Sequence, residues 1–359
     1  MTQGSIAAFG WHPLVADYVM RPDHPLKPYR YRLVHETLVR LGAFERPNAR
    51  VVEGRQADDA EIELVHDPAY VDAVRRLSRG DAGVDPAWYG FHEFGDTPPW
   101  PAMHEASATV VGTSLACYEE VRASRARVAF NGSGGLHHAL RARASGFCVY
   151  NDPAIVIARA VGDGLRVAYV DIDAHHGDGV QYAFYDTDRV LTISLHQVAL
   201  WFFPGTGYAR ERGESRGAGY SVNVALVPET DDVAYALAFD AVVPPLLSAF
   251  APDLLVTQGG FDSYWNCPIA QLALSTYGYE RCIRAFAATP YPWVALGGGG
   301  YDVDGVRRAW SIAYLVMLDA AIPSALHDSD PPRAVGPERQ RLDDAARRSA
   351  EAALAASFL

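Results

Sequence analysis

The spacing of Asp173 and His175 makes this pair the strongest candidate in the sequence for holding a metal ion. Both residues follow a short β-branched run, so in extended geometry their side chains point to the same side and can reach one ion. A third ligand must come from elsewhere, and Asp262, at the end of a glycine-flanked run, is the best-placed carboxylate. Two carboxylates and one histidine leave positions for water and substrate, which suits a catalytic zinc better than a closed structural site.

A simpler interpretation is that these aspartates only cap the helices that follow the strands. The segment from 171 to 178 holds five polar side chains that could ligate or orient: Asp171, Asp173, His175, His176 and Asp178. Capping uses fewer polar groups than this. The metal-site interpretation is therefore favoured.

Two adjacent histidines form a second group. His137 and His138 follow two glycines, which let a backbone approach a site closely, and histidine titrates near neutral pH. Each imidazole needs an orienting partner on its other nitrogen, and Asp171 and Asp178 are the carboxylates left over for this purpose. A lone histidine is usually an ordinary core residue, but a tandem pair behind a glycine turn favours a catalytic role.

Aromatic residues in loops supply the remaining candidates. Tyr301 follows four glycines, which could form merely a tight turn, although a phenol held over a metal site can donate a hydrogen bond to an oxyanion. Phe147, Trp201, Phe202 and Phe203 lie in glycine-rich loops with little sequence to cover them. Core packing is the alternative for any one of them, but together they predict a narrow apolar tunnel.

The elements that must position these groups alternate between strands and helices. Short β-branched runs predict buried strands at 127–130, 166–171, 189–195, 220–226, 253–257 and 293–296. Helical spacing occurs at 231–250, where Pro244-Pro245 predicts a kink, and at 271–287, whereas 194–219 is too irregular for a helix. The alternation predicts an α/β fold with a parallel sheet covered on both faces, whose strand ends bring the polar clusters to one rim.

Composition limits the class of protein. The chain has 359 residues, 49% of them hydrophobic, and 31 basic against 43 acidic residues give a net charge of −12. It can bury enough apolar surface to fold as one large or two ordinary domains, and its acidity argues against nucleic-acid binding. The acidity permits a basic or cationic partner, or is simply a solubilising surface charge.

The remaining expectations concern environment and boundaries. Four scattered cysteines without a Cys-x-x-Cys pair fit a reducing compartment, and neither a signal peptide nor an 18-residue apolar stretch is recognised, so we expect a soluble cytoplasmic protein without a membrane partner. Residues 1–323 are expected to form the catalytic domain. Residues 324–359 are expected to add a loop and a helix over 338–358 that packs on it, or alternatively serves as a tail for a partner. A monomer or small homo-oligomer is expected.

These motifs resemble those of the histone deacetylase family, especially its bacterial acetoin-utilisation and amidohydrolase members. They keep the family's order and spacing from about Asp23 to Trp310. The matched stretches are 24–30, 95–98, 134–138, 146–152, 171–179, 202–207, 258–262 and 297–301.

The resemblance implies a single arginase-like α/β domain that removes acetyl groups from acetyl-lysine in proteins or peptides. One catalytic zinc, with iron as an alternative, would be bound by Asp173, His175 and Asp262. By family likeness, His138 held by Asp178 would be the general base and then acid, His137 held by Asp171 would tune the site, and Tyr301 would stabilise the oxyanion.

The resemblance also implies substrate and cation contacts. The substrate-binding residues would be Asp96 at the rim, Gly146, Phe147 and Phe203 along the tunnel, and Arg30 at an inner cavity through which acetate leaves. Two structural potassium ions would be held, the first by Asp171, Asp173, His175, Ser194 and Leu195, the second by Phe184, Thr187, Val190 and Tyr220. The chain departs from many relatives at Val198-Ala199-Leu200-Trp201, so we expect a rim of different shape and with it a different substrate choice.

Three other functions compete with this one. A dimanganese ureohydrolase would share the fold, but it needs further aspartates where this chain has Gly177, Gly260 and Tyr264. Acetylated polyamines, or other small acetamides, could replace acetyl-lysine as substrate, and the acidic charge does not discriminate between them. A non-catalytic acetyl-lysine reader would lack a ligand, base or tyrosine, and none is missing.

Overall fold

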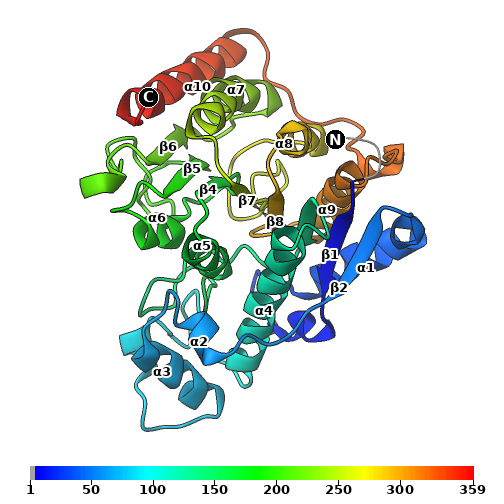
Figure 1. Cartoon of the computed structure of the whole chain (residues 1–359). Helices are drawn as coiled ribbons and strands as arrows, with labels where there is room; N and C mark the ends of the chain where they lie inside the picture. Colours follow the sequence, from blue (N-terminus) through cyan, green and yellow to red (C-terminus); the bar gives the residue numbers. More distant parts are fainter. Residues whose placement is uncertain (1–4) are drawn as a thin grey trace.

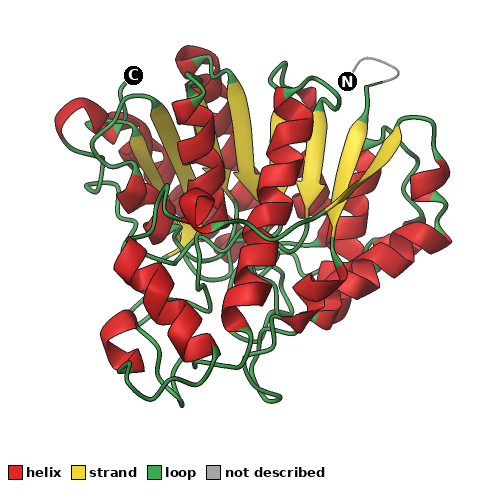
Figure 2. Ribbon diagram, turned by 60° about the horizontal axis from the view of Figure 1, so that its bottom comes forward, coloured by secondary structure: helices red, strands yellow, loops and turns green. Residues whose placement is uncertain are grey.

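The computed structural model describes residues 5–359, and these form an eight-stranded parallel β-sheet with helices on both faces (Figures 1 and 2). The strands follow the order β2-β1-β3-β8-β7-β4-β5-β6. They are β1 (Ala7–Trp11), β2 (Ala49–Glu53), β3 (Val128–Asn131), β4 (Val167–Asp171), β5 (Val190–Gln197), β6 (Ser221–Leu226), β7 (Leu254–Gln258) and β8 (Trp293–Leu296). The predicted α/β class with a mainly parallel sheet is confirmed.

The helices form two layers, one on each face of the sheet (Figure 1). One layer holds α1 (Tyr29–Arg40), α9 (Val303–Met317), α8 (Thr276–Ala288), α7 (Asp232–Phe250) and α10 (Gly336–Ala356), each in contact with the next. The other holds α4 (Met103–Arg122), α5 (Asp152–Gly162) and α6 (Asp178–Ala183), and α3 (Pro68–Ser78), which follows α2 (Asp59–Ile62), packs against α4. Strands β3, β4, β7 and β8 are buried throughout, as expected for a sheet covered on both faces.

The six predicted strands are all present, with their ends shifted by at most two residues. The edge strand β2 and its neighbour β1 were not predicted. The first is half-exposed and begins and ends beside charged residues, and the second is rich in alanine and glycine, so neither carries the buried β-branched run that marks the central strands. The predicted helix at 271–287 starts later, at Thr276, because the Ser275 side chain accepts hydrogen bonds from the amides of Tyr277 and Gly278 and caps it there.

The register of the central strands places their carboxyl ends on one line. Asn131 of β3 pairs with Leu296 of β8, which pairs with Gln258 of β7, which pairs with Asp171 of β4, which pairs with Ser194 of β5. Every loop that carries a predicted catalytic or metal-binding side chain therefore leaves the sheet at the same edge, where the arrowheads point in Figure 2.

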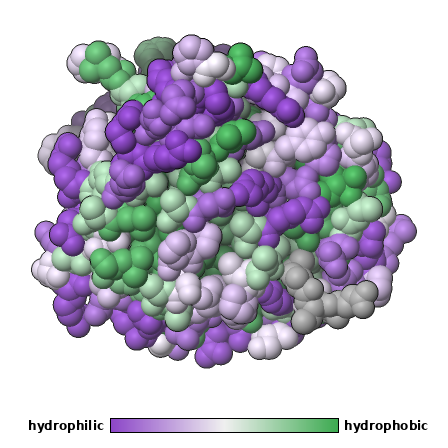
Figure 3. Space-filling model, turned by 90° about the horizontal axis from the view of Figure 1, so that it is seen from above, coloured by the Kyte–Doolittle hydropathy of each residue, from purple (hydrophilic) through white to green (hydrophobic). Residues whose placement is uncertain are grey.

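Helix α7 differs from one sequence expectation. By length and composition it is apolar enough to cross a membrane, although no such stretch was expected. Half of its most apolar 18 residues are buried, its inner side covers the sheet, and α10 packs against it, as in the core helices of folded proteins. Apolar side chains gather in patches on this face (Figure 3), and a groove of about 260 Å³ lies between α7 and α8.

The segment after residue 323 is tied into the fold by a buried carboxylate. One oxygen of Asp328 accepts hydrogen bonds from Tyr264 Oη at 2.7 Å and Arg308 Nη1 at 2.8 Å, and the other accepts two from Thr276. Further along, the small apolar residues of α10 pack against α7 and β6. Burial raises the pKa of Asp328, but these donors outweigh it and hold the pKa below its usual value.

Asp328→Asn is expected to lower the free energy of unfolding by about 2 kcal/mol, because a carboxylate that accepts four hydrogen bonds is replaced by a neutral amide. The pKa is lowered in the folded state, so the contribution is present above the unfolded-state pKa, about 3.9, and is lost as the pH falls through the folded-state value. Urea denaturation at pH 7 and at pH 3 measures both effects. Asp330→Asn, at an exposed position nearby, should leave stability unchanged; equal effects of the two substitutions would contradict the expectation.

Candidate active site

The three predicted metal ligands lie together, buried, at the carboxyl end of the sheet. Asp173 and His175 are on the loop after β4, and Asp262 is on the loop after β7, the neighbouring strand. One possible ligand atom from each lies within 4.8 Å of the other two. His175 Nδ1 is 2.8 Å from an Asp262 oxygen and 3.2 Å from an Asp173 oxygen, so the three groups point at one common space.

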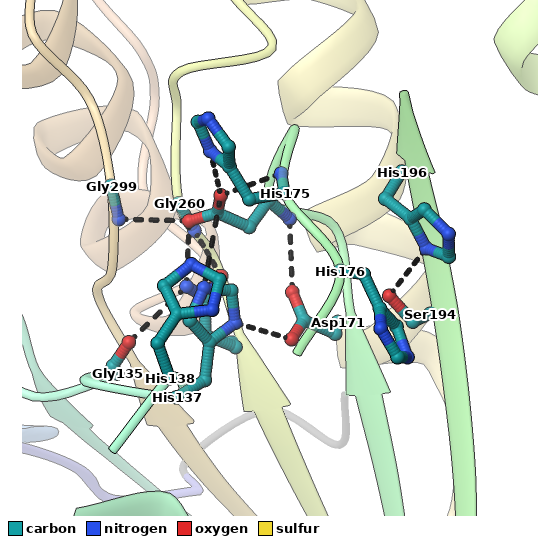
Figure 4. A network of polar contacts seen from close by, with 12 residues as sticks. Gly135, His137, His138, Asp171, His175, His176, Ser194, His196, Gly260 and Gly299 are labelled. Atoms are coloured by element: carbon teal, nitrogen blue, oxygen red, sulfur yellow. Dashed lines mark hydrogen bonds and ion pairs between the residues drawn. The ribbon is translucent and has the colours of Figure 1, made fainter. Parts of the chain in front are cut away.

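Main-chain amides and the Gln258 side chain hold these ligands in place (Figure 4). Asp173 Oδ2 accepts hydrogen bonds from Gln258 Nε2 at 2.7 Å and from the Gly299 amide at 2.9 Å. An Asp262 oxygen accepts one from the Ala174 amide at 2.7 Å. A Cβ atom on Gly299 would lie 2.3 Å from Asp262 Oδ2, so only glycine allows the backbone to approach this closely.

The electrostatics of the group fit a bound cation. Asp173 and Asp262 are at most 1% exposed, and the hydrogen bonds to them come from neutral groups and from His175. Burial lowers the pKa of His175, but the two carboxylates outweigh burial and raise it to about 10. Burial and the adjacent Asp173 together raise the pKa of Asp262 to about 6. Two buried carboxylates and one imidazole around a common space are a donor set suited to Zn²⁺ or Fe²⁺.

The two histidines predicted to act together lie side by side on the loop after β3 (Figure 4), with ring centroids 4.0 Å apart. His137 Nδ1 is 2.7 Å from an Asp171 oxygen, and His138 Nδ1 is 2.7 Å from an Asp178 oxygen. Both predicted pairings are thus found in the structure. The second nitrogen of His137, Nε2, lies 4.0 Å from an oxygen of the predicted metal ligand Asp173.

The pair is electrostatically asymmetric. Burial lowers the pKa of His138, the neighbouring His137 lowers it further, and Asp178 does not reverse the effect. Burial also disfavours the charged form of His137, but Asp171 and Asp173 outweigh it and raise the pKa of His137 to about 9. One imidazole is therefore held neutral, and can accept a proton, beside one that is held charged.

A buried aspartate that sequence reasoning overlooked positions this loop. Asp152, at the start of α5, accepts hydrogen bonds from the amides of Gly135 and Leu136 and from Ser114 Oγ. These two amides immediately precede His137, so the carboxylate sets the direction in which the histidines leave the sheet. Its place in the matched stretch 146–152 was the available signal.

A cavity of about 540 Å³ leads from the surface to these groups. His138, His175 and Tyr301 line its inner end, and Phe147 and Phe203 line its sides. The rings of Phe203 and His138 pack edge to face with centroids 4.9 Å apart, and those of Phe147 and Tyr301 do so with centroids 5.7 Å apart. All four aromatic residues of the predicted tunnel line this cavity, together with polar residues such as Arg21 and Asp96.

The walls and rim of the cavity hold the other predicted substrate residues. Gly146 lines it with a φ of +53°, and a Cβ there would lie 2.5 Å from the His138 ring. Phe147 also has a positive φ, +69°, and is held by hydrogen bonds from Tyr18 Oη to its carbonyl and from its amide to Thr97 Oγ1. Asp96 lies exposed at the rim.

Arg30 is fully buried behind the strand end that carries Tyr301. It donates hydrogen bonds to the carbonyls of Gly298, at 2.7 Å, and Gly300, and its guanidinium lies 5.0 Å from the ring centroids of both Tyr31 and Trp310. It is not among the residues that line the cavity.

The residues predicted to hold potassium fall in two places. Asp171 and Ser194 pair across neighbouring strands, with Asp173, His175 and Leu195 close by in sequence. Phe184 and Thr187 lie between α6 and β5, Val190 is the first residue of β5, and the carbonyl of Tyr220 accepts a hydrogen bond from the Thr192 amide of β5. Potassium binding itself stays a prediction.

Comparison with known proteins agrees with the resemblance seen in the sequence. The family model described as histone deacetylase domain matches residues 24–317. The chain is 37% identical to the acetoin utilization protein AcuC of Bacillus subtilis over 322 residues, which cover 87% of this chain and 82% of that protein. It is 34% identical to histone deacetylase B of Dictyostelium discoideum (92% and 78% covered) and 33% identical to histone deacetylase clr6 of Schizosaccharomyces pombe (90% and 80% covered).

Asp262→Asn is expected to weaken zinc binding at least about 100-fold, because it removes one of two ligand carboxylates while preserving side-chain shape. Elemental analysis after dialysis against limiting Zn²⁺, with circular dichroism to verify folding, measures the change. Asp231→Asn is the matched control, since Asp231 is also buried but caps α7. Undiminished zinc in the Asp262 variant would contradict the assignment of this ligand.

Proposed function

The chain belongs to the histone deacetylase family, and we propose that it is a zinc-dependent deacetylase that hydrolyses the acetamide of acetyl-lysine in proteins or peptides and releases acetate. The observation that carries the proposal is the meeting of three groups at the inner end of one cavity. These are the cluster of Asp173, His175 and Asp262, the histidine pair, and the Tyr301 phenol.

Asp173, His175 and Asp262 would hold the metal. When bound, zinc polarises the acetamide carbonyl and lowers the pKa of a water molecule. The sequence favours a single-ion site over the two-ion site of a ureohydrolase, because Gly177, Gly260 and Tyr264 stand where a second ion would need aspartates. Within residues 5–359 no other group of three potential ligands converges in the same way.

The histidines and the tyrosine would carry the proton transfers and charge stabilisation. His138, buried at the cavity floor and bonded through Nδ1 to Asp178, presents Nε2 as the base that takes a proton from water and then delivers it to the departing amine. His137, paired with Asp171, places positive charge beside it. Burial and the nearby carboxylates of Asp262 and Asp173 raise the pKa of Tyr301, so its phenol stays protonated and can donate a hydrogen bond to the developing oxyanion.

The remaining predicted residues would bind substrate, product and structural cations. Phe147 and Phe203 would grip the aliphatic stem of acetyl-lysine, Asp96 would accept hydrogen bonds from substrate backbone amides, and Arg30 would favour departing acetate through its charge. Two potassium ions would be bound near the ends of β4 and β5. The register pair of Asp171 and Ser194 supports the first of these sites.

Removal of the metal with a chelator is expected to abolish acetate release, and added Zn²⁺ is expected to restore it. The reason is that Asp173, His175 and Asp262 can bind a metal ion but cannot polarise the acetamide carbonyl without one. Acetate release should be measured with metal content on the same sample, and Mg²⁺ is the control ion because it prefers all-oxygen sites. Full activity in metal-depleted protein would refute zinc dependence.

His138→Ala should lower kcat by about 10²- to 10⁴-fold through loss of the base. Tyr301→Phe should lower kcat more than it weakens substrate affinity, since the phenol acts on charge that exists only in the transition state. Steady-state kinetics with an acetylated peptide measures both, with Tyr277→Phe, at an exposed position, as control. Undiminished turnover by the His138 variant would refute the assigned base.

Acetyl-lysine peptides are expected to have a higher kcat/KM than acetylspermidine. The side chains at the cavity mouth include one fixed acid, Asp96, and one fixed base, Arg21, and so offer little net attraction to a polycation. A direct comparison of the two substrates under the same conditions tests this. A strong preference for the polyamine would favour the alternative function, deacetylation of a small acetamide.

A further inference from the structure

Three large apolar side chains stand exposed at the mouth of the cavity. Leu200 is 84% exposed, Trp201 94% and Phe94 90%, and all three line the cavity. They lie on two separate loops, outside the part of the cavity that Phe147 and Phe203 enclose. Large apolar side chains clustered on a surface in this way are typical of sites that bind another molecule.

The backbone holds Trp201 in an unfavourable conformation. Residues 199–202 form a turn closed by a hydrogen bond from the Phe202 amide to the Ala199 carbonyl, 3.1 Å long. Trp201 occupies the third position with a φ of +63°, where glycine or asparagine is usual. Strain of this kind at a non-glycine residue is found preferentially at functional sites.

Hydrogen bonds from other segments fix both loops, so the exposed side chains project from an ordered backbone. On the first loop, Arg21 Nη1 donates to the Gly95 carbonyl at 3.3 Å, and His24 Nε2 lies 3.0 Å from the Asp96 carbonyl. On the second, the buried ring of His176 bonds to Thr206 Oγ1 at 2.8 Å, and that of His196 bonds to the Gly207 carbonyl at 2.8 Å.

The cavity is larger than one side chain requires. Its volume of about 540 Å³ lies within the range, roughly 300–1,000 Å³, of pockets that enclose drug-sized molecules. The acetyl-lysine stem would fill the part between Phe147 and Phe203, which leaves the part lined by Trp201 and Phe94 for neighbouring parts of the substrate.

The composition of the outer part favours an apolar group of a polypeptide over a polyamine chain. Besides histidines, the charged residues in the lining are Arg21 and Asp96, of opposite sign, and Arg21 also pairs with Asp23 at 3.1 Å. Pro25 and Ile269 add further apolar surface. A polyamine would bring several ammonium groups to a mouth whose lining holds a single carboxylate, Asp96, whereas an apolar side chain would find matching surface on several residues.

We propose that Leu200, Trp201 and Phe94 form a recognition site for a bulky apolar side chain next to acetyl-lysine in a polypeptide substrate. The proposal rests on the proposed function, whose substrate it specifies. The expected preference is for peptides with phenylalanine, leucine or tryptophan within two positions of the acetylated residue.

The test compares acetylated peptides that differ only in the flanking residue, phenylalanine or glycine, at each of two positions on either side. For the wild type, the ratio of kcat/KM values, phenylalanine over glycine, should be about ten or more at one position at least. Trp201→Ala should reduce that ratio about tenfold, as expected for loss of a buried aromatic contact, and Phe94→Ala should reduce it in the same direction. Trp88→Ala is the matched control: this tryptophan is 82% exposed but does not line the cavity, and the ratio should be unchanged.

Binding to the His138→Ala protein, alone and combined with Trp201→Ala, separates recognition from turnover. If the His138→Ala protein binds the phenylalanine peptide more tightly than the glycine peptide, and the double variant does not, the recognition site is supported. Failure of the wild type to hydrolyse any peptide would refute only the proposed function. If peptides are hydrolysed but the kcat/KM ratio, phenylalanine over glycine, is the same in the wild type and in the Trp201 and Phe94 variants, the recognition site is wrong. The deacetylase function would still stand. Preferential binding of acetylspermidine through Trp201 would overturn the choice of a polypeptide.

Discussion

Burial of carboxylates beneath one cavity is the constraint on which the rest of the structure depends. Five aspartates, namely Asp152, Asp171, Asp173, Asp178 and Asp262, are buried at the carboxyl end of the sheet. A buried charge is costly unless hydrogen bonds or an opposite charge compensate it. Each aspartate therefore has its own compensating partners. Main-chain amides bond to Asp152, and histidines bond to Asp171 and Asp178. Asp173 and Asp262 share the His175 imidazole and could share a cation.

The strand register and the glycines follow from that constraint. Parallel strands that end on one line deliver their loops to the same small volume, and side chains from loops far apart in the sequence can then share charge. At Gly299 the main-chain amide reaches the Asp173 carboxylate at a point where a Cβ would collide with Asp262. The tetraglycine before Tyr301 thus gives the Asp173 carboxylate a main-chain donor and places the phenol at the cavity floor.

Sequence reasoning predicted most of the site and less of its support, for physical reasons. Ligands and catalytic groups are rare residue types with fixed spacing, such as Asp173 with His175 or the tandem His137 and His138, so they are recognisable without a structure. Asp152 was overlooked because its role is to accept hydrogen bonds from main-chain amides, which every sequence has. The edge strand β2 was overlooked because a half-exposed strand carries no continuous apolar run, and its buried neighbour β1 was overlooked because alanine and glycine replace the β-branched residues typical of strands. Asp328 could not be foreseen because its partners come from three separate segments, at residues 264, 276 and 308.

The loop after β5 carries two kinds of contact in consecutive residues. Phe202 stacks on His175, with ring centroids 4.8 Å apart, and Phe203 packs against His138, while Leu200 and Trp201 face outward from the same turn. A mutation that reshapes the outward part of this turn will also shift the rings that touch the imidazoles. Evolution therefore has little freedom to alter selectivity through this loop without altering catalytic rate. The loop of Phe94 contributes no ring to the imidazoles, so it offers the more independent route by which related enzymes could diverge in what they recognise.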